Sequence, residues 1–122
     1  RCLLGEEDMT GDELLRQIRF YGLDNRSIQM WSREIKMLGR EEIRDFIRMV
    51  TGLIGIPLGG FISHDKRILI SRGEKLYAHT CTYELETPKF ATEEDLHEAL
   101  AASFVVLHLD EGMDEWHTLH QV

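Results

Sequence analysis

Hydrophobic residues recur at helical spacing in several parts of this chain. The clearest run covers residues 40–51 and is followed by Gly52, a residue type that commonly ends helices. Its apolar residues fall at positions i, i+3, i+4 and i+7: Ile43, Phe46, Ile47 and Val50. Arg and Glu occupy many of the other positions. The run therefore predicts an amphipathic helix that buries one face in the core.

Two further helices are predicted upstream of this one. Thr10 and Glu13 form a capping-box pattern, which begins a short helix that runs toward Ile18 and ends at residues 20–22. Ser27 is the predicted N-cap of the next helix, which ends at Gly39. The apolar residues of this second helix recur at helical spacing: Ile28, Trp31, Ile35 and Leu38.

The last predicted helix begins at Thr92, which is followed three residues later by Asp95 in a capping pattern. Apolar and small residues lie along one side of it: Leu96, Ala99, Leu100, Ser103 and Phe104. Residues 105–109 are predicted to form a strand. The acidic run 110–115 is interpreted as a solvated terminus, and residues 114–122 as a tail extension.

Strands are predicted where short apolar or alternating runs lie between turn signals, at residues 61–63, 68–71 and 76–85. Residues 64–66 and 72–74 are the predicted turns, and the glycine-rich stretch 52–60 is a tight connection. In the third run, alternation predicts that the odd positions share one face: Tyr77, His79, Cys81, Tyr83 and Leu85. The expected fold is α/β (α+β), a single domain over residues 1–122 in which a small mixed four-stranded sheet packs against several helices.

Composition narrows the class of protein. With 122 residues, 43% hydrophobic and 30% charged, the chain can bury a core and is typical of a soluble globular domain. A net charge of -8 argues against nucleic-acid binding, which requires clustered Lys and Arg. No run is apolar enough to cross a membrane and the start lacks a signal pattern, so we expect a cytoplasmic protein, with the nucleus as an alternative. Because the chain begins at Arg1, we expect a segment of a longer polypeptide.

His79, Thr80 and Cys81 are the residues with the clearest chemical potential. Polar hydroxyl residues flank the cysteine, and a reactive thiolate requires partial exposure and hydrogen-bond donors. A buried, inert cysteine beside a strand histidine is the alternative, and the local pattern favours neither. Cys2 and Cys81 are expected to be reduced, because two cysteines are too few for a disulfide-rich secreted scaffold.

Several separated motifs follow one another in a recognisable order. They are Val50-Thr51-Gly52, Ile56-Pro57 with Gly59-Gly60-Phe61, His79-Thr80-Cys81, Leu85 with Pro88 and Phe90, and Leu96 with Leu100. In this order and spacing the chain resembles the C-terminal lobe of HECT-type ubiquitin ligases, over nearly its whole length.

The resemblance implies a catalytic role for the cysteine. In that family the cysteine accepts ubiquitin from a ubiquitin-conjugating enzyme as a thioester and passes it to a lysine of a protein substrate. Cys81 matches that residue, while His79 and Thr80 match positions that we assign to positioning the thiol and the thioester. The conjugating enzyme docks on a separate N-terminal lobe, which is missing from this chain. No cofactor or metal is implied.

The chain departs from the family pattern at three places. One is the segment Glu86-Thr87-Pro88-Lys89 before Phe90, where the family commonly has Leu-Pro-Pro before its aromatic residue. Thr82 and Tyr83 stand where the family usually has Phe-Asn. The family also ends shortly after a Gly-Phe whose aromatic ring assists transfer to lysine. Depending on the alignment, Met113 or Leu119 takes that place here, and Trp116 is a candidate replacement for the ring.

Two alternatives to a catalytic lobe are open. A module of the same fold can bind ubiquitin or another partner after losing transfer, which the changes at Thr82 and Tyr83 favour. An unrelated cysteine hydrolase using Cys81 and His79 is less well supported, because no orienting Asp or Asn is recognisable. The glycine-rich stretch lacks the Lys-Ser or Lys-Thr of a phosphate-binding loop, and the spacing of His and Cys gives no zinc motif.

Overall fold

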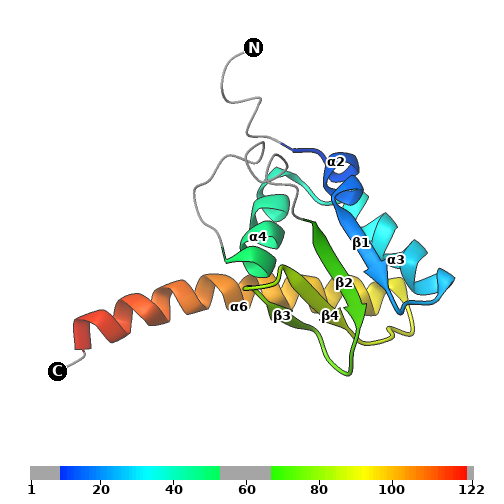
Figure 1. The fold of residues 1–122 in the computed structure, drawn as a ribbon. Helices are drawn as coiled ribbons and strands as arrows, with labels where there is room; N and C mark the ends of the chain where they lie inside the picture. Colours follow the sequence, from blue (N-terminus) through cyan, green and yellow to red (C-terminus); the bar gives the residue numbers. More distant parts are fainter. Residues whose placement is uncertain (1–8, 53–66, 121–122) are drawn as a thin grey trace, which may run out of the picture.

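The computed structural model describes residues 9–52 and 67–120, with side chains through residue 109. These residues form four helices and four strands, so the expected α+β class is confirmed (Figure 1). In chain order they are α2 (Gly11–Arg16), β1 (Ile18–Tyr21), α3 (Asn25–Lys36), α4 (Arg40–Thr51), β2 (Ile68–Arg72), β3 (Tyr77–His79), β4 (Glu84–Thr87) and α6 (Glu93–His120). The predicted strand 61–63, turn 64–66 and most of the connection 52–60 lie outside the described residues.

The strands form one mixed sheet in the order β1-β2-β4-β3. Strands β1 and β2 pair in parallel, as do β2 and β4, whereas β3 runs antiparallel to β4. A parallel pair needs a crossover, and α3 and α4 lie in the chain between β1 and β2. The predicted four-stranded mixed sheet is therefore confirmed, although β1 was not expected and β3 and β4 take the place of one predicted strand.

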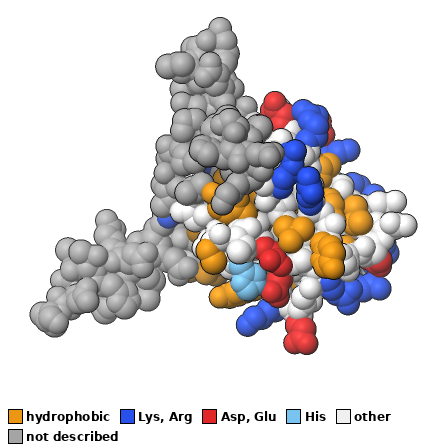
Figure 2. Space-filling view, in the orientation of Figure 1, with side chains coloured by type: hydrophobic (Ala, Val, Ile, Leu, Met, Phe, Trp, Pro, Cys, Tyr) orange, Lys and Arg blue, Asp and Glu red, His pale blue; other side chains and the backbone are white. Residues whose placement is uncertain are grey.

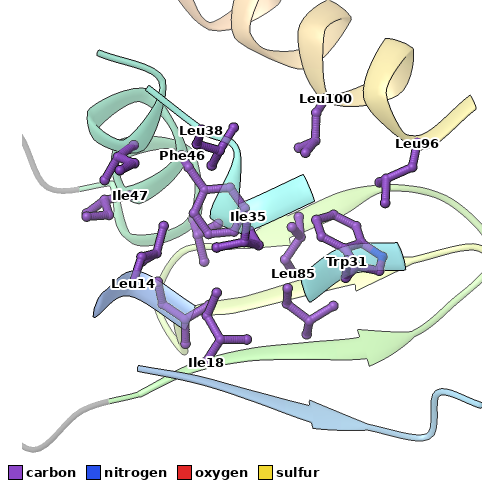
Figure 3. Close-up of a cluster of buried hydrophobic side chains, with 14 of the residues drawn as sticks. Leu14, Ile18, Trp31, Ile35, Leu38, Phe46, Ile47, Leu85, Leu96 and Leu100 are labelled. Atoms are coloured by element: carbon purple, nitrogen blue, oxygen red, sulfur yellow. The ribbon is translucent and has the colours of Figure 1, made fainter. Parts of the chain in front are cut away.

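The core lies between the sheet and the helices α3, α4 and α6, as Figure 3 shows. Trp31 and Phe46 are the largest fully buried side chains, and burying such a side chain stabilises the fold by about 1.5–3 kcal/mol. The indole Nε1 of Trp31 donates a hydrogen bond of 3.2 Å to the hydroxyl of Thr87 at the end of β4. This bond joins α3 directly to β4.

The helix caps agree with the sequence at α2, where the Thr10–Glu13 capping box is present, and at α6, where Thr92 accepts from the Asp95 N–H. The predicted N-cap of α3, Ser27, is wrong. Asp24 is the N-cap, and the Ser27 N–H donates to its carboxylate at 3.1 Å. Hydrogen bonds from the side chain and backbone of Ser27 lower the pKa of Asp24 to about 2.

Two helix ends also differ from the prediction. Helix α2 ends at Arg16, and residues 18–21, expected to finish that helix, form β1. Ile18 follows Leu14 at helical spacing, but the backbone of residues 18–21 pairs with β2 instead. Helix α3 ends at Lys36, and Gly39, the predicted stop, is the N-cap of α4.

The predicted strand at residues 105–109 is wrong, because α6 continues through it to His120. The acidic run 110–115, expected as a tail, therefore lies in a helix. Figure 1 shows the C-terminal part of α6 extending past the sheet. The side chains of Val105, Val106 and Leu109 are more than half exposed on this part of the helix.

Among the described residues, helices cover one face of the sheet and no helix covers the other, which we call the open face. Core-facing residues such as Ile18, Ile68, Ile70 and Leu85 are buried. Alternation along each strand places the remaining residues on the open face. They are Arg19, Tyr21, Leu69, Ser71, Tyr77, His79, Glu84 and Glu86. Figure 2 shows a face of the molecule on which a histidine lies beside acidic and hydrophobic side chains.

Candidate functional site

Cys81 lies in the loop of residues 80–83, which connects β3 to β4, and its side chain is exposed. The predicted single strand over residues 76–85 is therefore wrong, and so is the shared face of its odd residues. The loop is held by backbone hydrogen bonds from the Thr82 N–H to the His79 carbonyl (3.2 Å) and from the Tyr83 N–H to the Thr80 carbonyl (3.4 Å). The Thr82 hydroxyl also donates to the His79 carbonyl at 3.3 Å. Cys81 thus stands at the tip of a closed hairpin loop.

The loop ends in an uncommon backbone conformation. Tyr83 has a φ of 57°, in the left-handed region that L-residues other than Asn and Asp seldom occupy. Its carbonyl accepts a hydrogen bond of 2.9 Å from the Leu69 N–H, next to the first residue of β4. This left-handed residue therefore turns the chain out of the loop and into register with β2.

Thr80, on the other side of Cys81, packs against the end of α4. Gly52 caps this helix with a φ of 73°. A Cβ added at Gly52 would lie 3.4 Å from the Cβ of Thr80, which is ordinary van der Waals contact. The two motifs Val50-Thr51-Gly52 and His79-Thr80-Cys81 are thus neighbours in space, although they are far apart in the sequence.

The imidazole of His79 is directed along the open face of the sheet. Its Nε2 lies 2.6 Å from a carboxylate oxygen of Glu86, and its ring meets the Tyr77 ring edge-on with centroids 4.8 Å apart. In the described part of the chain no hydrogen bond joins His79 to Cys81. The hydrolase interpretation requires such a pair, so the geometry does not favour it.

Three of the sequence-predicted site residues come together in this hairpin and three do not. His79, Thr80 and Cys81 are consecutive at the end of β3 and in the loop. The backbone of Met113, Trp116 and Leu119 belongs to the C-terminal part of α6, and their side chains lie outside the described residues. Sequence reasoning missed Glu86 as the partner of His79, because strand pairing, not sequence spacing, brings the two together.

Two contacts between a histidine of α6 and a carboxylate fix this helix to α3 and α4. His97 Nδ1 lies 2.7 Å from the nearly buried carboxylate of Glu34, and His108 Nε2 lies 3.1 Å from Asp45. The hydrogen bond and the negative charge of Glu34 raise the pKa of His97 above its usual value. These contacts anchor the part of α6 that packs against α3 and α4 and contributes Leu96, Leu100 and Phe104 to the core.

The described residues 9–52 and 67–109 contain no group of three or more His, Cys, Asp or Glu side chains placed to hold a metal ion. Over the same part of the chain, none of the helices combines the length and the apolar character that a membrane crossing requires.

The sequence matches one known protein family over most of its length. The model of the HECT-domain (ubiquitin-transferase) family matches residues 1–105. The chain belongs to the HECT-domain family. Because the HECT match includes the loop 80–83 and ends inside α6, Cys81 lies within it, whereas Met113, Trp116 and Leu119 lie beyond it.

Two curated relatives of this HECT-family chain are named as ubiquitin ligases. One is a bifunctional serine/threonine-protein kinase/NEDD4-like E3 ubiquitin-protein ligase of Dictyostelium discoideum, 34% identical over 80 residues, or 63% of this chain. The other is the E3 ubiquitin-protein ligase UPL1 of Arabidopsis thaliana, 34% identical over 76 residues, or 54% of this chain. The matches cover only 4% and 2% of those proteins, so each relative contains a great deal more chain than the part compared.

Proposed function

We propose that this chain is the catalytic C-terminal lobe of a HECT-type ubiquitin ligase and that Cys81 carries ubiquitin as a thioester. The observation that supports this most directly is the exposed thiol at the tip of a hydrogen-bonded hairpin loop. A nucleophile that receives a protein-sized acyl group must be reachable from outside, which a core cysteine is not. Membership of the HECT family and the ligase names of both relatives point to the same chemistry.

The reaction proceeds through two acyl transfers. The Cys81 thiolate attacks the thioester carbonyl between ubiquitin and the conjugating enzyme, a new S–C bond forms, and the conjugating enzyme leaves as a thiolate. A substrate lysine amine then attacks the Cys81 thioester, an amide forms, the amine loses its proton and the Cys81 thiolate is released. A thiolate suits both steps, because it exchanges with a thioester at little free-energy cost and leaves readily.

Thr80 and His79 position the loop that carries the thiol. Thr80 rests against the end of α4 at Gly52, and the His79 carbonyl accepts two hydrogen bonds from Thr82. The contact of Thr80 holds the residue before Cys81, and the hydrogen bonds to the His79 carbonyl hold Thr82, the residue after it. In this proposal neither residue acts as a general base toward the thiol.

The partners follow from this role. Ubiquitin is the acyl group, a ubiquitin-conjugating enzyme supplies it, and a protein substrate receives it. In the sheet that the described residues form, β3 is an edge strand and leads directly into the Cys81 loop. The edge backbone is therefore suitably placed for an extended ubiquitin tail to add as a further strand.

A single-turnover charging assay tests the proposal. The chain is fused to the N-terminal lobe of a HECT ligase, mixed with conjugating enzyme loaded with ubiquitin, and analysed on a non-reducing gel. We expect a thiol-sensitive adduct with the wild-type chain and with a Cys2→Ala control, and none with Cys81→Ala. Far-UV circular dichroism checks that all three proteins are folded.

The competing function is a partner-binding module of the same fold. The specific observation in its favour is the left-handed Tyr83, because a change at this residue alters the loop that presents the thiol. A folded wild-type chain that binds ubiquitin but forms no adduct, with an active conjugating enzyme, would select the binding module over the catalytic lobe.

A further inference from the structure

The carboxylate of Glu86 occupies a built position on the open face of the sheet. Glu86 lies on β4 opposite Tyr77 of β3. Gly73, in the connection after β2, leaves the space that the Glu86 side chain fills. A Cβ added at Gly73 would lie 2.4 Å from a Glu86 carboxylate oxygen and 2.9 Å from the Glu86 Cβ, both shorter than van der Waals contact. The Gly73 N–H also donates to the Thr87 carbonyl at 2.9 Å, which holds this segment against β4.

From that position Glu86 reaches across to the neighbouring strand. Its carboxylate oxygen lies 2.6 Å from His79 Nε2, and both side chains are about one-third exposed. The Tyr77 ring meets the His79 ring at an interplanar angle of 76°, in the edge-to-face arrangement that aromatic rings favour. The imidazole is thus held on one side by a carboxylate and on another by a ring.

His79 connects this cluster to the Cys81 loop through its own backbone. Its carbonyl accepts hydrogen bonds from both the N–H and the hydroxyl of Thr82, the residue after Cys81. Any rotation of the His79 peptide therefore moves the start of the loop. Glu86, His79 and the loop form one continuous chain of contacts over the open face.

We propose that Glu86 is a positioning residue for Cys81, which fixes the His79 side chain and, through the His79 backbone, the loop that presents the thiol. This rests on the proposed function, in which Cys81 accepts ubiquitin. The carboxylate accepts the Nε2–H of the imidazole, so it also selects the form of His79 that is protonated at Nε2. Small displacements of a nucleophile lower reaction rates strongly, so a residue that touches no substrate can still control charging.

Glu84 provides a matched comparison within the same strand and face. It lies opposite His79 in register, but its carboxylate accepts a hydrogen bond of 2.6 Å from the Ser71 hydroxyl on the other neighbouring strand. Removing either glutamate takes one negative charge from the open face. The Glu84→Ala and Glu86→Ala variants therefore separate a specific contact with His79 from a general loss of charge.

The first measurement is spectroscopic and needs no ubiquitin. The nitrogen resonances of His79 are recorded by NMR in the wild-type chain and identified among the six histidines by their loss in His79→Gln. We expect Glu86→Ala to shift the Nε2 resonance, Glu86→Gln to retain most of the hydrogen-bonded signal, and Glu84→Ala to leave it unchanged. An unchanged His79 spectrum in Glu86→Ala would overturn the proposal.

The second measurement is the single-turnover rate of the charging assay described above. We expect Glu86→Ala to lower this rate about tenfold, with Glu86→Gln restoring most of it and Glu84→Ala near wild type. Gly73→Ala provides an independent perturbation, because its new methyl group displaces the Glu86 carboxylate while leaving His79 and Glu86 chemically intact. It is expected to shift the His79 resonance and lower the rate in the same direction as Glu86→Ala.

The outcomes separate this inference from the proposed function. If the wild-type chain forms no thiol-sensitive adduct, the proposed function fails, and the NMR result still decides whether Glu86 holds His79. If the wild type charges and Glu86→Ala charges at the same rate, Glu86 is no positioning residue. An unchanged unfolding midpoint verifies that the Glu86→Ala protein is folded. A loss of charging rate in Glu84→Ala equal to that in Glu86→Ala would also contradict the proposal.

Discussion

Because Tyr83 has a left-handed backbone conformation, we predict that glycine at this position gives a more stable protein than alanine. At ordinary helix and strand positions the order is the opposite. We compare Tyr83→Gly with Tyr83→Ala. Both variants delete the same partly buried ring and its contacts, so the loss of packing cancels in the comparison. What remains is the backbone term at a φ of 57°, a conformation that glycine adopts without the steric cost that a Cβ brings.

The magnitude follows from two opposing effects. A Cβ in the left-handed region costs about 1–2 kcal/mol, whereas glycine loses more conformational entropy on folding, by about 0.5–1 kcal/mol. With the middle of each range, Tyr83→Gly should therefore be more stable than Tyr83→Ala by about 0.75 kcal/mol. Within a continuous strand the order would be reversed, because glycine in a strand is less stable than alanine by roughly 0.5–1 kcal/mol.

The assay is urea unfolding followed by tryptophan fluorescence, with free energies from linear extrapolation. Thr82 is the control, because Tyr83 is the one non-glycine residue with a positive φ in the described ranges. At residue 82 the alanine variant should be the more stable of the pair. If Tyr83→Ala proves as stable as Tyr83→Gly, the left-handed loop end is wrong, and with it the separation of residues 76–85 into two strands.

Two further predictions concern the core and the helix interface. Thr87→Val keeps the side-chain shape but leaves the buried Trp31 N–H without its acceptor, so it should lower the free energy of unfolding by about 1–3 kcal/mol. Thr87→Ser keeps the hydroxyl and should retain part of this stability in the same urea assay. The pKa of His97 is raised in the folded state, so the stabilising effect of its pair with Glu34 is complete below the ordinary histidine value of 6.5 and is lost as the pH rises through the raised pKa. The difference in unfolding midpoint between wild type and His97→Gln should therefore be greater at low pH than at high pH, and a difference that grows with pH would contradict the assigned pair.

Helical periodicity and capping signals predicted much of the fold from the sequence alone. The apolar pattern of α4 and the capping pairs at Thr10 and Thr92 are local features, and each is present in the structure. Strand β1 was missed because Ile18 continues the helical spacing from Leu14, and only its pairing with β2 decides the outcome. The β-branched pair Val105 and Val106 likewise favoured a strand, although the segment continues a helix anchored further upstream.

The hairpin at the candidate site is harder to predict than either of these elements. Residues 80–83 contain threonine and tyrosine, which favour strands, and none of the Gly, Pro, Asn or Asp residues that usually mark a turn. The left-handed conformation falls on Tyr83, a residue type for which no sequence rule predicts it. The identity of the cysteine as a candidate was accessible from the sequence, but its place at a loop tip was not.

The contacts that hold the loop of residues 80–83 explain why its conformation could not be predicted from the sequence. Thr80 packs near Gly52 at the end of α4, and the Tyr83 carbonyl accepts a hydrogen bond from the Leu69 N–H of β2. The His79 imidazole is hydrogen-bonded to the Glu86 carboxylate. The first two join residues distant in the sequence, and the third is a diagonal pair across two strands, which alternation alone does not reveal. A loop whose own residues favour a strand is thus bent by tertiary contacts on both sides of Cys81. Because the strain at Tyr83 must be offset by those contacts, weakening any one of them should disturb the presentation of the thiol before it unfolds the domain.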